Sequence, residues 1–223
     1  MIDFDGLLFD LDGTLLDTAP DFITSVNVQL AMHGQAQLPH EESRLNVTNG
    51  SAGLIQHAFG ISQEDPTFEE YKNELLSIYR HHLADKTVFF PGLLEVLHEC
   101  KNRAIPWGIV TNKPWAFTKP LLAELHLLEF SACTVCPDHV KKPKPDPESI
   151  NLACDLMHIN PARCIYIGDH ARDINAGKNA GMRTIAAHWG YVDNTEDISK
   201  WWATWIVKKS QLLRSFLFGT PEC

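Results

Sequence analysis

The sequence predicts an α/β protein whose core is a doubly wound, parallel, Rossmann-like sheet, with a small all-helical domain inserted near the beginning of the chain. Two observations lead to this fold class. From residue 91 onward, short apolar runs alternate with helix-length segments, as in a parallel sheet with helical crossovers. Residues 18–84 instead have helical periodicity and no strand-like run. We therefore expect a core of residues 1–17 and 85–223 and an inserted helical domain of residues 18–84.

The first strand is expected at the apolar run of residues 7–9, which stops at two carboxylates, Asp10 and Asp12. Alternation along an extended chain places these two side chains on the same side, and Gly13 lets the backbone turn sharply after them. In open α/β sheets, ligands bind at the carboxyl ends of the strands. Taken alone, the pair is equally compatible with a solvated Asp-Gly turn.

Three helices are expected in the inserted domain. The first begins after Asp17 and Thr18, either of which can cap it, and it continues to about Gly34. The second includes the apolar positions between residues 54 and 59, and the third covers about residues 67–82. A polar stretch separates the first helix from the second.

Strands and helices are expected to alternate in the rest of the chain. The expected strands are residues 107–111, 132–136, 164–167, 184–187 and 205–207, and the expected helices are residues 92–103, 114–126, 147–158, 174–180 and a closing helix around 212–213. Strands that alternate with helices of this length predict a parallel sheet with right-handed crossovers.

Composition and charge limit the partners of the protein. The formal net charge of −9 argues against non-specific binding to nucleic acid. The acidic start does not resemble a signal peptide, and apolar runs of membrane-spanning length are absent from the sequence. We therefore expect a cytoplasmic protein, a monomer or weak dimer, with neither nucleic acid nor membrane as partner.

The six cysteines predict reduced thiols rather than a metal or redox site. Cys133 and Cys136 have CxxC spacing, but a second CxxC or a histidine pair at zinc-site distance does not accompany them. They lie in a strand-like run, where alternation points their side chains to opposite faces. The remaining four, Cys100, Cys154, Cys164 and Cys223, are scattered.

Polar residues follow several of the predicted strands, and a doubly wound sheet can bring them to one crevice. They are Asp10 and Asp12, then Thr111, Asn112 and Lys113, then Asp169 and Asp173, with a basic loop of residues 141–147 ahead of the last group. Carboxylates gathered in this way repel one another unless a cation is bound, which indicates a hard divalent ion such as Mg²⁺. A lysine and a hydroxyl beside that ion can bind an anion.

These groups together predict phosphoryl transfer. Mg²⁺ and a lysine favour the ionised form of Asp10, whose attack on phosphorus would give an aspartyl phosphate. Asp12, two residues later, can protonate the leaving alcohol and then deprotonate water.

The same residues resemble a known family. Asp10-Leu-Asp-Gly-Thr-Leu, Val-Thr111-Asn, Lys-Pro-Asp-Pro and Gly-Asp169-x-x-x-Asp173 are similar to the four ordered motifs of the haloacid dehalogenase superfamily. The resemblance covers essentially the whole chain and implies the following roles. Asp10 would be the nucleophile, Asp12 the general acid and base, Thr111 and Asn112 the phosphoryl-binding residues, and Lys144 the bridge to the nucleophile. Mg²⁺ would be held by the Asp10 carboxylate, the Asp12 backbone carbonyl and Asp169, with Asp173 in an orienting role.

Two positions stay open at this point. Lys142 also fits the pattern of the basic loop, although the family spacing of about 25 positions between the lysine and the metal-binding aspartate favours Lys144. His170 stands where many relatives carry an acidic or hydroxyl residue. Its side chain either faces solvent or alters the surroundings of the metal.

The insertion resembles the helical cap of the phosphoglycolate-phosphatase-like branch. Asp17-Thr-Ala-Pro-Asp-Phe and Cys136-Pro-Asp-His-Val-Lys are similar to bacterial N-acetylmuramic acid 6-phosphate phosphatases. The resemblance implies a Mg²⁺-dependent phosphatase acting on a small phosphomonoester, either 2-phosphoglycolate or N-acetylmuramic acid 6-phosphate. Candidate cap contacts are Arg44, Asn49, Gly50 and Ser51, a stretch that reads equally well as a plain helix start.

Other functions share the same core. A sugar-phosphate mutase and a phosphonatase differ from a phosphatase mainly in the cap. A dehalogenase does not need a protonating Asp12, and a non-catalytic binding protein of this fold would usually lack one of the chemical groups, all of which are present.

Overall fold

The computed structural model describes residues 2–193 and 195–219, which form two compact units. The first unit consists of Met1–Leu16 and Phe89–Cys223, and the second is Asp17–Val88. The predicted insertion, residues 18–84, falls inside the second unit. Where the chain passes between the units, β2 (Leu16–Asp17) and β3 (Val88–Phe89) form a two-stranded sheet that the sequence pattern did not predict.

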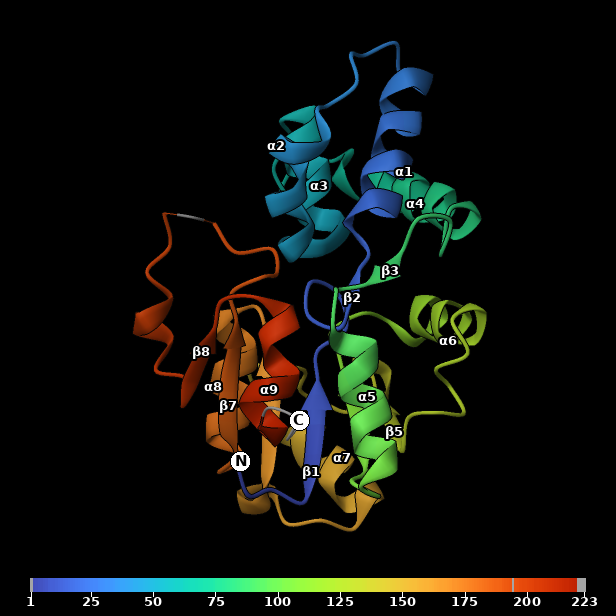
Figure 1. Ribbon diagram of the computed structural model, residues 1–223. Coiled ribbons are helices and arrows are strands. Elements are labelled where there is room, and N and C mark those ends of the chain that lie inside the picture. The colour runs from blue at the N-terminus through green and yellow to red at the C-terminus, as the bar shows by residue number, and fades with distance from the viewer. Residues whose placement is uncertain (1, 194, 220–223) are drawn as a thin grey trace. The chain divides into compact units, whose positions relative to one another are not determined.

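A six-stranded sheet is the centre of the first unit, and its order is β5-β4-β1-β6-β7-β8 (Figure 1). The strands are β1 (Gly6–Phe9), β4 (Trp107–Val110), β5 (Cys133–Val135), β6 (Cys164–Gly168), β7 (Arg183–Ala187) and β8 (Trp205–Val207). Each neighbouring pair is parallel. The predicted doubly wound parallel sheet is therefore confirmed.

The strand order reverses beside β1. The chain runs from β1 outward through β4 to β5, and then returns to the other side of β1 to place β6, β7 and β8. Phe9 at the end of β1 is level with Ile167, one residue before the end of β6. At such a switch point the loops that follow neighbouring strands separate, and the space between them is the usual ligand site of this architecture.

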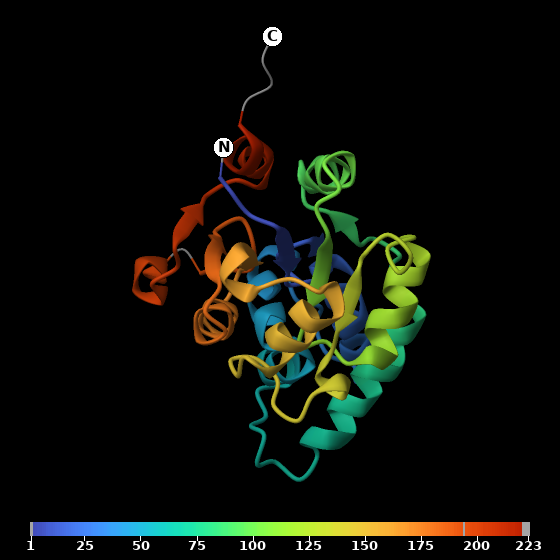
Figure 2. The same ribbon diagram turned by 90° about the horizontal axis from the view of Figure 1, so that it is seen from below.

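Helices cover both faces of this sheet. They are α5 (Leu93–Asn102), α6 (Trp115–Glu124), α7 (Glu148–Met157), α8 (Ala171–Asn179) and α9 (Leu213–Phe218). Figures 1 and 2 show α5 and α9 on one face and α7 and α8 on the other. The side chains of Leu7, Leu8 and Phe9 are fully buried between these layers. Burial of each such side chain contributes about 1.5–3 kcal/mol to the stability of the fold, so the central strand holds the following residue, Asp10, in a fixed position.

The second unit is helical: α1 (Ala19–Met32), α2 (His40–Arg44), the 3₁₀ helix η1 (Leu45–Asn49), α3 (Gly50–Phe59) and α4 (Phe68–His81). Phe22 of α1 stacks on Tyr79 of α4, with ring centroids 3.8 Å apart. The buried carboxylate of Asp21 accepts hydrogen bonds from the backbone N–H groups of Lys86 (2.8 Å) and Thr87 (3.1 Å). These bonds fix the returning chain to α1.

Some local expectations were wrong in detail. The polar stretch between the first two helices of the insertion is itself helical, as α2 and η1. Thr18 occupies the position before α1, but its side chain makes no capping hydrogen bond. α8 begins at Ala171, three residues earlier than the periodicity suggested, because His170 caps it. The sequence pattern also did not predict the short 3₁₀ helices η2 (Pro137–His139), η3 (Pro161–Arg163), η4 (Ile198–Trp201) and η5 (Ser210–Leu212).

The cysteines of the described residues are free thiols buried in the protein, and Cys223 lies outside those residues. Burial raises the pKa of Cys133 to about 12 and that of Cys136 to about 11. Within the same part of the chain, every helix is too short or too polar to cross a membrane.

Candidate active site

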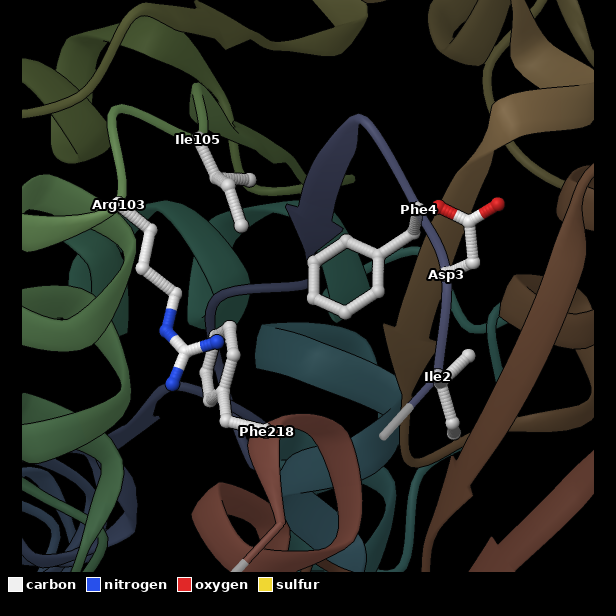
Figure 3. A pocket seen from close by; sticks show the side chains of 6 residues that line it. All are labelled: Ile2, Asp3, Phe4, Arg103, Ile105 and Phe218. Carbon is white, nitrogen blue, oxygen red and sulfur yellow. The ribbon is translucent and has the colours of Figure 1, made fainter. Parts of the chain in front are cut away.

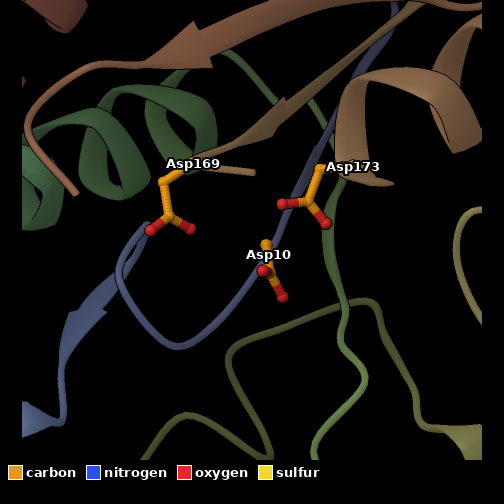
Figure 4. A group of neighbouring side chains, drawn as sticks. All are labelled: Asp10, Asp169 and Asp173. Carbon is orange, nitrogen blue, oxygen red and sulfur yellow. The ribbon is translucent and has the colours of Figure 1, made fainter. Parts of the chain in front are cut away.

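Three buried carboxylates meet at the switch point of the sheet. Asp10 follows β1, Asp169 follows β6, and Asp173 lies in the first turn of α8. Each offers an oxygen within 4.8 Å of the others, and Figure 4 shows the three side chains converging from these segments. The backbone N–H of Asp10 donates to the carbonyl of Ile167 (2.8 Å), so sheet pairing itself sets the spacing between the first two acids.

Lys144 supplies the positive charge of this cluster. Its ammonium lies 2.9 Å from Asp10 Oδ1 and 2.7 Å from Asp173 Oδ1, and its side chain is fully buried. The same nitrogen donates to the carbonyl of Val110 (3.0 Å) and to the hydroxyl of Tyr166 (2.8 Å). Four oxygens therefore surround a group that has three protons, which holds the lysine in one position.

Lys142, the alternative lysine of the loop, lies elsewhere. Its side chain is 74% exposed and is 4.0 Å from Asp146. The structure brings Lys144, and not Lys142, to the predicted nucleophile.

The charges of the cluster balance only when the acids bind protons or another cation. Lys144 compensates one of the three carboxylates. Burial, together with the neighbouring Asp173, raises the pKa of Asp10 to about 6. Burial, with Asp10 and Asp173 as further causes, raises the pKa of Asp169 to about 8. Burial by itself would lower the pKa of Lys144, but the two carboxylates beside it raise that pKa above its usual value. A hard divalent cation with oxygen ligands fits this donor set and would supply the missing charge.

Hydrogen bonds fix the orientation of each carboxylate. Asp10 Oδ1 accepts from the backbone N–H of Leu11 at 2.7 Å. Asp169 accepts from the hydroxyl of Thr14 on one oxygen and from the backbone N–H of Tyr191 on the other, both at 2.9 Å. These donors stabilise the charged forms and oppose the effect of burial.

Asp173 has its own backbone donor. Its Oδ2 accepts from the N–H of His170 at 3.0 Å, while Oδ1 faces Lys144. One carboxylate thus caps the start of α8 and orients the lysine at the same time.

Gly13 is required by both conformation and space. Its φ of +82° lies in the left-handed region, which favours glycine. A Cβ at this position would also collide with the carboxylate of Asp169. The glycine of the first motif therefore allows the loop after β1 to approach the acid that follows β6.

Thr111 and Asn112, the predicted phosphoryl-binding residues, follow β4. Thr111 is buried, and its hydroxyl oxygen accepts from the backbone N–H of Lys113 at 3.1 Å. The side chain of Asn112 donates to the carbonyl of Lys144 (3.0 Å) and accepts from its N–H (3.2 Å). Asn112 thus ties the end of β4 to the lysine loop, and its contact with a phosphoryl group stays a prediction.

Asp12 lies apart from the three-carboxylate cluster. Its Oδ1 is 3.1 Å from Nζ of Lys113, and its side chain is 23% exposed. A role for its backbone carbonyl in metal binding stays a prediction. The structure separates two environments: Asp10 in a buried cluster, and Asp12 beside a second lysine and in contact with solvent.

The candidate cap contacts lie in the second unit. Arg44 forms an ion pair with Asp17 at 2.9 Å. Asn49 is exposed and precedes α3 without capping it through its side chain. Gly50 and Ser51 are the first residues of that helix. Contact between any of these residues and a substrate stays a prediction.

His170 has a structural role at the start of α8. Its Nδ1 accepts from the backbone N–H of Arg172 at 3.1 Å, and its ring stacks on Trp201 with centroids 6.4 Å apart. Burial and the nearby Arg172 lower the pKa of its imidazole, which suits a neutral ring that accepts a hydrogen bond.

Reasoning from sequence missed three residues of the site: Tyr166, Thr14 and Lys113 in its contact with Asp12. Tyr166 is fully buried on β6, and its hydroxyl donates to the carbonyl of Val110 at 2.8 Å. The sequence signal for Tyr166 was its hydroxyl group in an otherwise apolar strand, because a buried hydroxyl needs a hydrogen-bond partner.

A small pocket occurs at the opposite end of the sheet. It has a volume of about 240 Å³ and is lined by Ile2, Asp3, Phe4, Arg103, Ile105 and Phe218 (Figure 3). Phe4 precedes β1, whereas the carboxylates follow β1 and β6. The pocket is therefore separate from the candidate active site.

Comparison with known proteins agrees with this geometry. A family model described as haloacid dehalogenase-like hydrolase matches residues 7–187. The N-acetylmuramic acid 6-phosphate phosphatase of Pseudomonas aeruginosa is 40% identical over 91% of this chain and 89% of its own length. A phosphoglycolate phosphatase of Xanthomonas campestris is 34% identical over 92% of each chain. A crystal structure described as a predicted phosphoglycolate phosphatase from Haemophilus somnus matches the fold with a TM-score of 0.82 at 23% identity, covering 97% of this chain and 99% of that one.

Proposed function

Because the chain belongs to the haloacid dehalogenase-like hydrolase family, we propose that it is a Mg²⁺-dependent phosphatase that hydrolyses a small phosphomonoester through a phosphorylated Asp10. The observation that carries the proposal is the buried ammonium of Lys144, 2.9 Å from the Asp10 carboxylate. A lysine held between a carboxylate nucleophile and a second acid supports binding of an anionic phosphoryl group at the same place.

In the first step, an Asp10 oxygen forms a bond to phosphorus while the bond from phosphorus to the leaving oxygen breaks. The leaving oxygen takes that electron pair, and Asp12 gives it a proton, so the alcohol departs. Lys144 and the hydroxyl of Thr111 bind the phosphoryl oxygens. In the second step, Asp12 takes a proton from water, whose oxygen attacks phosphorus and releases phosphate from Asp10.

The acids of the site would hold Mg²⁺. Asp10 and Asp169 would contribute carboxylate oxygens, Asp12 its backbone carbonyl, and Asp173 would orient the cluster. The spacing of the three carboxylates supports this assignment. When bound, the ion would supply positive charge to the phosphoryl oxygens, which is the main electrostatic need of phosphoryl transfer.

We assign N-acetylmuramic acid 6-phosphate as the first substrate candidate and 2-phosphoglycolate as the second. Two N-acetylmuramic acid 6-phosphate phosphatases are 38–40% identical to the chain, and the phosphoglycolate phosphatase of Xanthomonas campestris is 34% identical. We assign substrate selection to the helical unit, with Arg44 and Asn49 as candidate contacts, because the core motifs are expected to contact only the phosphoryl group.

We also propose that the protein is cytoplasmic and is a monomer or a weak dimer.

Phosphate release across a panel of small phosphomonoesters tests this function. With Mg²⁺, we expect the protein to release phosphate from N-acetylmuramic acid 6-phosphate with the highest kcat/KM. A hundredfold preference over 2-phosphoglycolate corresponds to about 2.7 kcal/mol of differential transition-state binding, which one or two hydrogen bonds can supply.

The other outcomes assign other functions. Formation of an isomeric sugar phosphate without phosphate release would identify a mutase. Hydrolysis of phosphonates alone would identify a phosphonatase, and inactivity toward the whole panel in the presence of Mg²⁺ would overturn the proposal.

A further inference from the structure

We propose that Lys113 is a positioning residue that holds the carboxyl group of Asp12 in place for proton transfer to the leaving oxygen. The inference deepens the proposed function and rests on it. Two lysines enter this site, and each has its own carboxylates: Lys144 contacts Asp10 and Asp173, whereas Lys113 contacts Asp12. The family motifs account for the first lysine and leave the second without a role.

The backbone of Lys113 is fixed on both sides. Its N–H donates to the hydroxyl oxygen of Thr111 at 3.1 Å, and its carbonyl accepts from the hydroxyl of Thr118 at 3.1 Å. Pro114 follows directly and limits the backbone further. The lysine therefore projects from a rigid turn between β4 and α6, the same turn that presents the predicted phosphoryl-binding residues.

Burial makes this ion pair different from a surface pair. The Lys113 side chain is 4% exposed, although its partner Asp12 is 23% exposed. A charged amine is rarely buried without a partner, because the loss of hydration has to be offset. Lys113 thus presents a buried ammonium to Oδ1 of a carboxyl group that is itself partly exposed to solvent.

The loop that carries Asp12 is also fixed. The N–H of Gly13 donates to the carbonyl of Leu16 at 2.9 Å, which closes the turn after β1. With the backbone of Asp12 held by this turn, the remaining freedom is rotation of its side chain. The contact at 3.1 Å from Lys113 Nζ to Oδ1 restricts that rotation and so helps to set the direction in which Oδ2 points.

Such positioning affects one class of substrate more than another. An alkyl phosphate has a poor leaving group, so its P–O bond breaks only when the leaving oxygen receives a proton in the same step. An aryl phosphate such as 4-nitrophenyl phosphate leaves as a stable anion and does not need that proton. Because kcat/KM covers the steps up to phosphorylation of Asp10, its dependence on the leaving group reports the position of the acid.

The test compares kcat/KM for both substrates in the full-length protein with Mg²⁺. We expect Lys113→Met to lower kcat/KM by about 10²-fold for the best alkyl substrate and by less than about threefold for 4-nitrophenyl phosphate. Lys113→Arg, which keeps the charge, should recover at least part of the alkyl activity. Lys200→Met is the matched control, because Lys200 is 78% exposed and lies 3.7 Å from Asp197 in an exposed pair.

The outcomes are distinguishable. If the wild-type protein releases phosphate from neither substrate, the proposed function fails. If the wild type is active and Lys113→Met loses equal factors on both substrates, or loses neither, Lys113 does not position the acid. Should Lys113→Met fail to fold, Lys113→Leu, which also removes the charge from this buried position, takes its place, and a loss that is equal for both substrates, or absent, would overturn the proposal.

Discussion

Two clusters of ion pairs lie at opposite ends of the same two strands. At the carboxyl ends, Lys144 contacts Asp10 and Asp173 at 2.9 and 2.7 Å. At the amino ends, Arg163 contacts Asp3 and Asp5, both at 2.8 Å. The distances are alike, but the side chains of the first cluster are 0–9% exposed and those of the second are 45–81% exposed.

The difference teaches that burial, and not distance, gives a charged cluster its chemical use. Water screens the exposed cluster, where hydrogen bonding to Arg163 lowers the pKa of Asp3. In the buried cluster, desolvation outweighs the lysine and raises the pKa of Asp10 to about 6. The exposed carboxylates are stabilised in their charged form by water and Arg163. The buried carboxylates lack water, so binding of a cation stabilises their charged form.

The strongest test of this contrast is Asp10→Asn. An amide is a poor nucleophile of nearly equal shape, so we expect kcat to fall by at least about a thousandfold. The fold should persist, because the substitution removes one negative charge from a buried, repelling cluster. Phosphate release and a thermal unfolding curve measure both effects. A variant that kept a tenth of the wild-type activity would exclude phosphorylation of Asp10.

Removal of the metal is expected to have the next largest effect. A chelator should abolish phosphate release, and Mg²⁺ should restore it. Ca²⁺ should bind but inhibit, because its looser and higher coordination allows Asp10 to bind through both oxygens. At a concentration of a hundred times Kd, the ion should stabilise the fold by about 2.7 kcal/mol. Full activity in chelator would show that the buried acids serve another purpose.

The stability of the metal-free protein should depend on pH in an unusual direction. In the folded state the pKa of Asp169 is raised to about 8 and that of Asp10 to about 6, whereas an unfolded aspartate has a pKa of about 3.9. Between these values the folded state binds more protons than the unfolded state. The contribution of these groups to stability is therefore complete below about pH 4 and is lost as the pH rises through 6 to 8.

Urea denaturation in chelator between pH 5 and 8.5 measures this effect. We expect the free energy of unfolding of the wild type to decline more steeply with pH than that of Asp169→Asn, which lacks the group with the larger shift. Equal slopes for the two proteins would mean that the buried cluster does not hold extra protons. Mg²⁺ should stabilise the wild type more at pH 8 than at pH 5, because the ion competes with those protons.

The sheet, the acids at its carboxyl edge and the loop that supplies the lysine could be predicted from the sequence, because each of them depends on a local pattern. Apolar runs define strands, and the residues after neighbouring parallel strands must share one edge. Spacing favoured Lys144 but did not exclude Lys142, since the register within a proline-rich loop depends on contacts such as those of Lys144 with Asn112.

Contacts between distant residues could not be predicted in the same way. Lys113 and Asp12 are 101 residues apart, and the Tyr166 partner of Lys144 is 22 residues away. A sequence pattern indicates that Tyr166 is buried but does not say which carbonyl or ammonium its hydroxyl meets. The early start of α8 has a local cause that periodicity overlooks, because His170 and Asp173 cap the helix reciprocally.

The smallest expected effect belongs to the exposed cluster and completes the contrast. Arg163→Met removes both ion pairs, but Asp3 and Asp5 are then solvated by water rather than left buried. The backbone bond from the N–H of Asp5 to the carbonyl of Arg163 (2.8 Å) does not depend on the side chain and keeps the start of β1 in place. We expect kcat/KM to stay within about twofold of the wild type, and any shift in the thermal midpoint to disappear at high salt.

Lys144→Met is the matched variant, because it leaves the acids of the buried cluster without their ammonium and should destabilise the protein strongly. Equal losses in stability for the two variants would show that burial does not separate the clusters.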